Sequence, residues 1–184
     1  MRILVTGASG SGTSTLGRAV AEALQAAFVE VDDLYWLPTD PPFKQKRDPV
    51  ERAALLRGKL GGSQPVVVSG SIVAWDRELE DAFDLIVFLR APAALRAERL
   101  RAREQRRFGR VDEHFIAWAE QYDQGIMSGR SLAKHLAWLN LRTCPILRLS
   151  GTDSVETLQT AVLTALLEQD RGRHTAEVDR TSQS

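Results

Sequence analysis

The sequence is short of cysteine, and this scarcity excludes two kinds of stabilising site. Its 184 residues include a single cysteine, Cys144, so the chain can form neither an intramolecular disulfide nor a cysteine-based zinc site. Cys144 stands just before the apolar run 145–149. This position is more typical of a buried structural thiol than of a reactive one, and we therefore expect Cys144 to be structural.

Long hydrophobic runs and a net charge are also missing. No segment approaches the length needed to span a bilayer, and the N-terminus lacks an apolar stretch of signal-peptide length. Lysine plus arginine equals aspartate plus glutamate, at 24 each, so overall charge indicates neither nucleic-acid nor membrane binding. We expect a cytoplasmic protein with one main domain.

The first 27 residues have the pattern of a phosphate-binding loop. The apolar run 3–5 precedes the glycine-rich turn 7–12, and a segment with apolar residues at helical spacing follows. Glycines let consecutive backbone N–H groups turn toward an anion, and the start of the helix adds partial positive charge. The residues that we expect to bind a nucleotide here are Gly7, Ser9, Gly10, Ser11, Gly12, Thr13, Ser14 and Thr15.

This loop lacks the lysine of the usual motif. The motif is Gly, four residues, Gly, Lys and then Ser or Thr, whereas Thr13 stands in the lysine position of this chain. Ser14 can still offer its hydroxyl to Mg²⁺, and backbone N–H groups can still cradle phosphates. A cation from elsewhere in the chain could replace the lysine, because phosphoryl transfer depends on positioning and charge neutralisation.

A second apolar run, 28–31, is followed by Asp32 and Asp33. Acids at the carboxyl end of a strand point toward the crevice where open α/β sheets bind ligands. Helix capping or simple solvation is the alternative, but a neighbouring phosphate loop favours a metal or catalytic role. We predict that both acids are catalytic, and that Asp32 and Ser14 bind Mg²⁺.

The region 34–62 is predicted to bind an acceptor molecule. Its first part, 34–49, holds four prolines in sixteen residues, which exclude a long helix, and a short helix follows at 50–60. Aromatic and cationic side chains on a loop suit a planar, anionic small molecule, although a small satellite core with a solvated rim is equally compatible. The residues that we expect to bind the acceptor are Tyr35, Trp36, Lys44, Arg47 and Gly70.

Arginines are concentrated in the middle of the chain. Arg99 and Arg103 are four residues apart on a predicted helix and share one face, and the segment 104–112 adds further arginines around a glycine. A solvated face and an RNA contact are the alternatives. With a phosphate loop present, we favour an arginine-rich lid at 104–112 that closes over phosphates, with Arg103 and Arg107 as catalytic residues.

Five apolar strands alternate with helices along the chain. Such alternation predicts an α/β fold with a parallel sheet covered by helices on both faces. The ligand crevice then lies at the carboxyl ends of the strands. The polar, aperiodic segment 170–184 is expected to be disordered.

Two segments resemble the nucleoside monophosphate kinase superfamily, which includes adenylate, cytidylate and shikimate kinases. They are the loop 7–15 and the segment 88–103, which is similar to the adenylate kinase strand, proline and helix that lead into the lid. The stretch around Asp32 also resembles small topology-modulation kinase-like proteins. The resemblance implies a three-layer P-loop fold at 1–169, with a five-stranded parallel sheet in the order 2-3-1-4-5.

The same resemblance implies ATP and Mg²⁺ as cofactors and a small-molecule phosphate acceptor, most readily a nucleoside monophosphate. It places Arg99 against the adenine, Arg103 on phosphates and Gly151 beside the adenine edge. Thr13 is compatible with activity, because archaeal cytidylate kinases are similar in this loop. A nucleotide-binding regulatory protein with weak or no kinase activity is the alternative. We expect a monomer or homodimer, and nucleic acid is not the expected partner.

Overall fold

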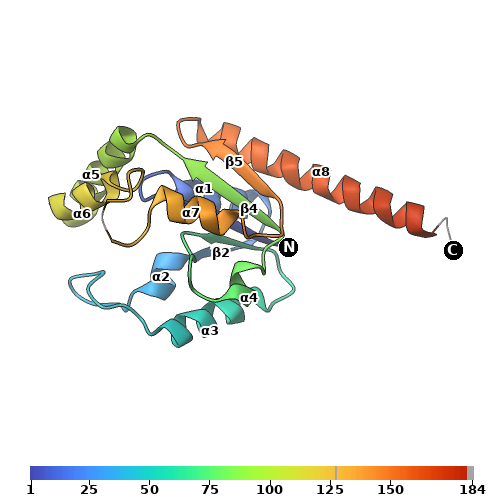
Figure 1. The fold of residues 1–184 in the computed structure, drawn as a ribbon, viewed down its shortest axis with the longest axis horizontal. Coiled ribbons are helices and arrows are strands. Elements are labelled where there is room, and N and C mark those ends of the chain that lie inside the picture. Colours follow the sequence, from blue (N-terminus) through green and yellow to red (C-terminus); the bar gives the residue numbers. More distant parts are fainter. Residues whose placement is uncertain (127, 182–184) are drawn as a thin grey trace.

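A five-stranded parallel sheet forms the centre of the protein. The computed structural model describes residues 1–126 and 128–181. The strand order is β2-β3-β1-β4-β5 (Figure 1), which confirms the order that the family resemblance implied. The strands are β1 (Arg2–Gly7), β2 (Ala27–Glu30), β3 (Val66–Ser69), β4 (Leu85–Arg90) and β5 (Ile146–Ser150).

The three central strands are apolar because helices cover both of their faces. Ile3, Leu4 and Val5 of β1 are fully buried, and the valines of β3 and the aliphatic run of β4 flank them in parallel register. Continuous hydrophobic runs of this kind are characteristic of parallel sheets between two helical layers. The polar residues that follow the strands are thereby gathered at one edge of the sheet.

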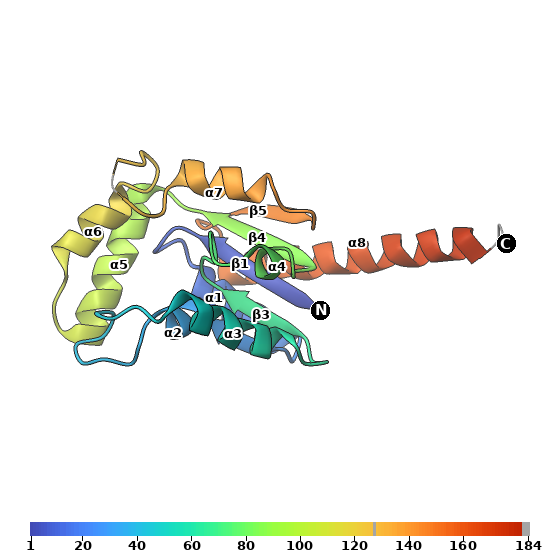
Figure 2. The ribbon, with the colours of Figure 1, turned by 60° about the horizontal axis from the view of Figure 1, so that its bottom comes forward.

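Two separate hydrophobic cores lie on the two faces of the sheet. One core contains side chains of α1 (Thr13–Ala23) and α8 (Val155–Thr181), and Figure 2 shows these helices together on one side. The helices that contribute to the other core are α2 (Val31–Tyr35), α3 (Pro49–Leu60), α4 (Arg77–Glu80) and α7 (Leu132–Leu139). The sheet and its two coverings form the three layers expected.

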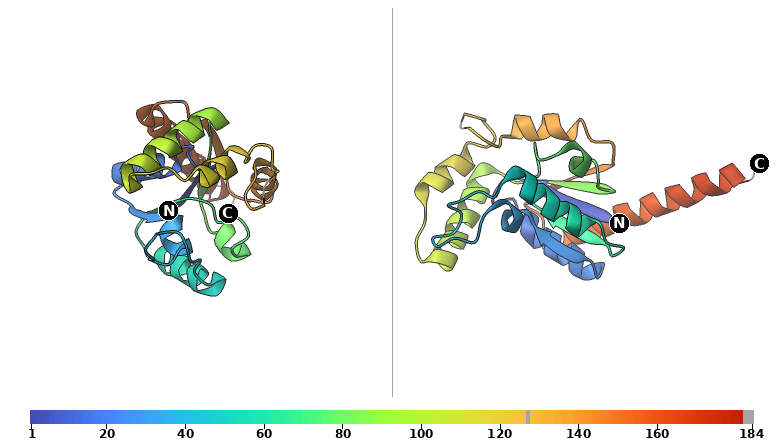
Figure 3. Two further views of the ribbon diagram at one scale, coloured as in Figure 1. Left: turned by 90° about the vertical axis from the view of Figure 1, so that its left-hand side faces the viewer. Right: turned by 90° about the horizontal axis from the view of Figure 1, so that it is seen from below.

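Helices α5 (Ala93–Phe108) and α6 (Glu113–Glu120) form an arm at one end of the molecule (Figures 2 and 3). They pack on each other through a small cluster of their own, which is centred on Leu100 and Ile116. The predicted lid segment 104–112 comprises the last turn of α5 and the connection to α6. Gly109 ends α5 with a φ of 69°, a left-handed conformation that glycine adopts without strain.

Two elements differ from their predicted bounds. Strand β2 ends at Glu30, so Asp32 and Asp33 lie in the first turn of the short helix α2 rather than at a strand end. Helix α8 continues to Thr181 and projects away from the sheet (Figure 1), where the sequence predicted disorder from residue 170. The segment has no proline and several good helix formers, so the helix continues without an apolar face. Residues 182–184 of the predicted tail lie outside the described residues.

No helix within the described ranges is both long enough and apolar enough to cross a membrane.

Candidate nucleotide and acceptor site

The phosphate loop joins the carboxyl end of β1 to the first turn of α1. Gly10 and Gly12 have φ values of 80° and 102°, in the region that other residues adopt only with strain. A Cβ atom at Gly10 would also lie 2.6 Å from the backbone oxygen of Arg96. Gly12 caps α1 without a side-chain hydrogen bond, so the first N–H groups of the helix remain available to an anion.

Ser14 in this first turn is hydrogen-bonded to Glu30, the last residue of β2. The Ser14 hydroxyl donates to Oε1 of Glu30 over 3.0 Å, and a guanidinium nitrogen of Arg18 lies 4.0 Å from Oε2. Ser69 is the neighbour of Glu30 in the parallel register. Its hydroxyl is buried and finds no hydrogen-bond partner within the described residues, which leaves an oxygen free for a ligand.

The environment of Glu30 disfavours a bare negative charge. Burial raises the pKa of Glu30 to about 7, the hydrogen bond from Ser14 opposes this rise, and the negative charge of Asp32 adds to it. A carboxyl group in this state is neutralised either by a proton or by a nearby cation. Glu30 is therefore suited to a site that a divalent cation enters together with a nucleotide.

The oxygen atoms at this position fit Mg²⁺. Mg²⁺ is commonly bound by one or two carboxylates and completes its coordination with waters and substrate phosphates, and Ser14 and Glu30 supply protein oxygens beside the phosphate loop. No three histidine, cysteine, aspartate or glutamate side chains gather into a metal-binding group in the part of the chain that the structure describes. The arrangement suits a metal whose remaining ligands come from a nucleotide.

Asp32 and Asp33 were predicted as the acids of this site, and both are exposed in α2. Their charges act on Glu30, so they lie in its neighbourhood, but the hydrogen bond from Ser14 goes to Glu30. Sequence reasoning missed Glu30 because it placed the end of β2 one residue late. Glu30 is the last residue of the short strand that begins at Ala27. An acid at this place in the sequence is the signal that could have identified it.

Arg99 and Gly151, predicted to contact the nucleotide, lie against the phosphate loop. Nη1 of Arg99 donates to the backbone oxygen of Gly151 over 2.9 Å and approaches that of Ser11 at 3.5 Å. A Cβ atom at Gly151 would lie 2.5 Å from the Ser11 oxygen. The loop after β5 and the phosphate loop therefore touch, with the Arg99 guanidinium at their junction.

The predicted lid arginines occupy other surroundings. Arg103 lies over the ring of Phe115, 5.9 Å from its centre, and pairs with Glu104. Arg107 lies 5.2 Å from the ring centres of both Phe43 and Phe108. Among the described contacts, neither arginine reaches the phosphate loop. Arg107 instead joins the end of α5 to the tip of the acceptor region.

The residues predicted to bind the acceptor do not all face one space. Nη1 of Arg47 pairs with Glu51 at 2.6 Å and its Nε donates to the Leu34 carbonyl, so Arg47 stabilises the loop itself. Lys44 is exposed, and Trp36 packs edge-on against Tyr35 and Phe43. The backbone N–H of Gly70 donates to the Val5 carbonyl, which holds the end of β3 beside β1.

Arg52 of α3, which sequence reasoning missed, contacts two aromatic rings in the predicted acceptor region. Its guanidinium lies 4.7 Å from the ring centres of both Tyr35 and Trp75. Its Nε is buried without a hydrogen-bond partner, and no ion pair to it is formed within the described residues. A guanidinium held by aromatic rings and lacking a carboxylate partner is suited to bind an anion.

A cavity of about 290 Å³ opens beside this region. Its walls are the loop after β3 on one side and the start of α7 with the preceding segment on the other. Two cations, Arg130 and Lys134, stand among small and apolar residues. The lining residues are Val73, Ala74, Gly129, Arg130, Ser131, Lys134 and His135.

His135 lines the cavity and contacts hydroxyl groups from three other segments of the chain. Its Nδ1 lies 2.7 Å from the Tyr122 hydroxyl, and its Nε2 lies 3.1 Å from the Thr6 hydroxyl and 3.5 Å from that of Ser71. Burial lowers the pKa of His135 to about 4, and the charge of Arg130 adds to this effect. The imidazole is therefore neutral at pH 7 and links β1, the loop after β3 and the base of the arm through polar contacts.

Comparisons with known proteins show the family to which the chain belongs. Residues 3–116 match the family described as AAA domain. The uncharacterized protein YqaC of Bacillus subtilis (strain 168) is 37% identical over 163 residues, which cover 83% of this chain and 90% of YqaC. The chain therefore belongs to this AAA domain family.

Two solved kinases share the fold at low sequence identity. A gluconokinase from Sinorhizobium meliloti 1021 is 20% identical with a TM-score of 0.59, covering 95% of this chain and 96% of its own. A shikimate kinase from Bacteroides thetaiotaomicron is 19% identical with a TM-score of 0.61, covering 91% and 98%. The three-layer fold that the sequence resemblance implied is thus shared with these two solved small-molecule kinases.

Proposed function

We propose that the protein is an ATP-dependent kinase that transfers a phosphoryl group to a small anionic acceptor. The observation that carries this proposal is the phosphate loop with its left-handed glycines, set beside the hydrogen-bonded pair Ser14 and Glu30. Together they provide backbone donors for phosphates and side-chain oxygens for a metal in one place. This combination is what phosphoryl transfer from a nucleotide requires.

Each group has a defined task in this proposal. The N–H groups from Gly10 to Thr15 hold the β- and γ-phosphates, and the helix dipole of α1 favours their charge. Ser14 and Glu30, with Asp32 as the predicted further acid, hold Mg²⁺. When bound, Mg²⁺ neutralises charge on the phosphate oxygens. Glu30 also orients the Ser14 hydroxyl through the hydrogen bond seen in the structure.

The cation that replaces the missing lysine comes from α5 in this proposal. Arg99 already touches the phosphate loop, whereas Arg103 and Arg107 require the arm to close over the crevice. An arginine delivered to the transferring phosphate contributes about 10³–10⁵ in rate in other phosphate-loop enzymes. Thr13 can therefore occupy the lysine position without removing catalytic charge from the site.

Arg52 and the cavity lined by Arg130 and Lys134 support an acceptor that carries an anionic group. A nucleoside monophosphate, the acceptor that the sequence favoured, meets this requirement through its phosphate. The neighbours of known fold are a gluconokinase and a shikimate kinase, so gluconate and shikimate are candidates as well. A guanidinium binds a carboxylate and a phosphate in the same bidentate manner.

A coupled assay with ATP and Mg²⁺ tests this proposal. The acceptor panel contains the nucleoside monophosphates, gluconate and shikimate, and the Ser14→Ala variant serves as the matched control. We expect turnover with at least one acceptor and a large loss in the variant. An enzyme that binds ATP yet turns over no acceptor faster than the variant does would contradict the proposal.

A second candidate is a nucleotide-binding protein that regulates rather than catalyses. Thr13 and Ser69 favour it, because they stand where a lysine and a metal-binding aspartate are common in phosphate-loop enzymes. Thr13→Lys separates the two candidates. A large gain in rate would indicate a degenerate site, whereas a loss would indicate a site built around threonine.

A further inference from the structure

The rings of Tyr35 and Trp75 both contact the Arg52 guanidinium, and we call this pair of rings the aromatic clamp. The backbone of Trp75 is hydrogen-bonded to a buried acid, Glu80. The ring planes of Trp75 and Tyr35 are inclined by 27°, with centres 6.3 Å apart. The backbone N–H of Trp75 donates to Oε1 of Glu80 over 3.1 Å and also to the Ile72 carbonyl over 3.1 Å. Glu80 thus contacts the loop that carries the clamp.

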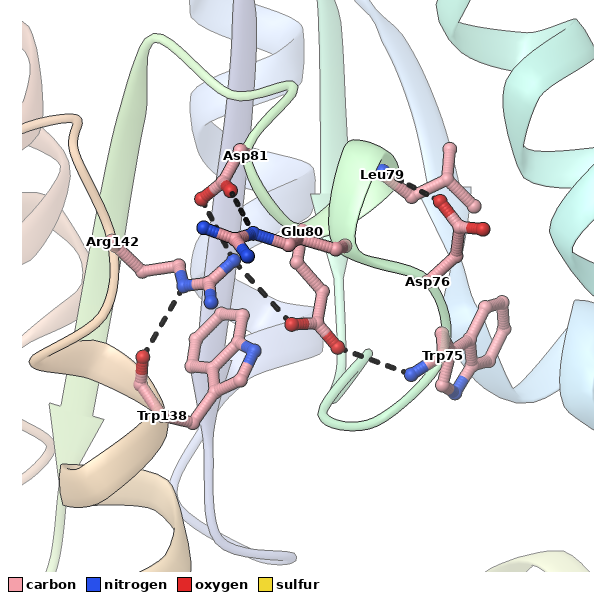
Figure 4. Close-up of polar contacts among 8 residues, drawn as sticks. Trp75, Asp76, Leu79, Glu80, Asp81, Trp138 and Arg142 are labelled. Atoms are coloured by element: carbon pink, nitrogen blue, oxygen red, sulfur yellow. Dashed lines mark hydrogen bonds and ion pairs between the residues drawn. The ribbon is translucent and has the colours of Figure 1, made fainter.

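Glu80 is itself fixed by a buried arginine. Nη1 of Arg142 lies 3.4 Å from Oε2 of Glu80 and 2.8 Å from Oδ1 of Asp81, and the Arg142 side chain is 4% exposed. Nε of Arg142 donates to the Trp138 carbonyl over 3.2 Å at the end of α7. Figure 4 shows the Glu80 carboxylate between the Arg142 guanidinium and the Trp75 N–H.

This cluster joins the two walls of the cavity. Val73 and Ala74 form one wall of the cavity, and Glu80 is the last residue of α4, the next helix along the chain. The start of α7 forms part of the opposite wall, and Arg142 follows the end of α7. Ala74 has a φ of 59°, an unfavourable conformation for a residue with a Cβ, which persists only where its surroundings hold it. The bond from Trp75 to Glu80 supplies such a restraint at the next residue.

A buried ion pair is a costly way to gain stability, because desolvation of both charges offsets most of their attraction. The contacts here have a geometric result instead. They hold one particular backbone N–H, that of Trp75, whose ring lies against a guanidinium without a carboxylate partner. The orientation of that guanidinium determines how an anion can be bound, since its donors form a rigid planar fork.

We propose that Glu80 is a positioning residue of the acceptor site: it holds the Trp75 backbone, so that the indole ring orients the Arg52 guanidinium for an anionic group of the acceptor. This inference rests on the proposed function in naming the anion as part of an acceptor. The mechanical link from Glu80 through Trp75 to Arg52 does not depend on catalysis.

Titration with inorganic phosphate tests the link without an identified acceptor. Isotope-labelled tryptophan gives one indole N–H signal in NMR for each of the four tryptophans, and the signal of Trp75 reports an anion at Arg52. We expect phosphate to shift this signal in the wild type, Glu80→Ala to weaken the apparent affinity about tenfold, and Glu80→Gln to retain most of it because its amide oxygen still accepts from Trp75.

Asp81→Asn is the matched control, because it removes a carboxylate from the same arginine without touching Trp75. Equal affinities in Glu80→Ala and Asp81→Asn would overturn the proposal, as would the absence of any phosphate response at Trp75 in the wild type. With an acceptor from the kinase assay, Glu80→Ala should raise the KM for that acceptor and leave the KM for ATP unchanged. A kinase assay without turnover contradicts the proposed function alone.

Discussion

The proposed nucleotide end of the crevice is built from backbone, and the proposed acceptor end is built from side chains. At the proposed nucleotide end, the glycine-rich loop 7–12 and the first turn of α1 are consecutive in the sequence and present N–H groups. At the acceptor end, Tyr35, Arg52 and Trp75 come from separate elements and meet through their rings and charge. The first kind of site is local in the sequence, and the second exists only after the chain has folded.

The two ends therefore respond differently to substitution. A change in the loop acts through backbone conformation, because a single added Cβ atom can prevent the left-handed conformation that the loop requires. A change in the acceptor region acts through the position of one side chain relative to others, so its effect should be smaller and confined to one substrate.

The largest effect is expected from Gly10→Ala. The left-handed φ of Gly10 and the nearby Arg96 oxygen both oppose a Cβ atom, and we expect a loss of about 3 kcal/mol, or roughly 100-fold in ATP affinity. Isothermal titration with ATP measures it. Gly58→Ala is the control, because Gly58 lies in α3 with nothing near its would-be Cβ. It should stabilise the helix slightly, and equal losses of ATP affinity in both variants would refute the backbone account.

His135, which lines the cavity and contacts the Thr6 hydroxyl of β1, should make stability depend on pH. Its pKa in the folded protein is about 4, against an ordinary value of 6.5, so the unfolded chain binds a proton more readily. Stability is then lost as the pH falls from about 6.5 to about 4, by about 3 kcal/mol in all, and this contribution is constant above that range.

Urea denaturation at a series of pH values measures this slope. His135→Gln should remove the His135 contribution to the slope, whereas His114→Gln should retain it, because His114 is exposed. A slope in the His135→Gln variant that matches the wild type would contradict the prediction.

Arg52→Lys should weaken the acceptor and spare the nucleotide. Lysine keeps the charge but loses the planar fork that two rings hold. We expect the KM for the acceptor to rise about tenfold, close to 1.4 kcal/mol, with the KM for ATP unchanged. Lys59→Met, an exposed change on the same helix, should alter neither constant. An equal rise in both KM values for Arg52→Lys would place Arg52 outside the acceptor site.

The smallest effect is expected where the end of α5 contacts the tip of the predicted acceptor region. Arg107 lies over Phe43, and such a contact at an exposed position contributes about 0.5–1 kcal/mol. Arg107→Gln should therefore raise the acceptor KM two- to fivefold, roughly the factor that this energy permits. Arg106→Gln, its exposed neighbour in the same turn, should have no effect, and a fall in kcat alone would instead favour the predicted catalytic role of Arg107.

The comparison also explains how much could be predicted from the sequence. The strand, glycine loop and helix at the N-terminus were predicted correctly because their pattern is local, whereas the sheet order was implied by the family resemblance and is confirmed. Strand β2 ends one residue earlier than predicted, so the prediction chose Asp32 instead of Glu30 as the acid beside Ser14. Residue identity alone cannot distinguish neighbouring acids. In the sequence, nothing distinguishes Arg52 from other polar residues on the surface of a helix. Its role depends on Trp75, which the folded chain brings beside it.

The acid beside Ser14 is the most direct test of the nucleotide site. The measurement is the affinity for ATP with and without Mg²⁺, determined calorimetrically for the wild type, Glu30→Gln and Asp32→Asn. We expect that Glu30→Gln loses most of the Mg²⁺-dependent gain in affinity and that Asp32→Asn loses less of it. Retention of the full gain by Glu30→Gln, or a larger loss in Asp32→Asn, would contradict the assignment of Glu30 to the metal site.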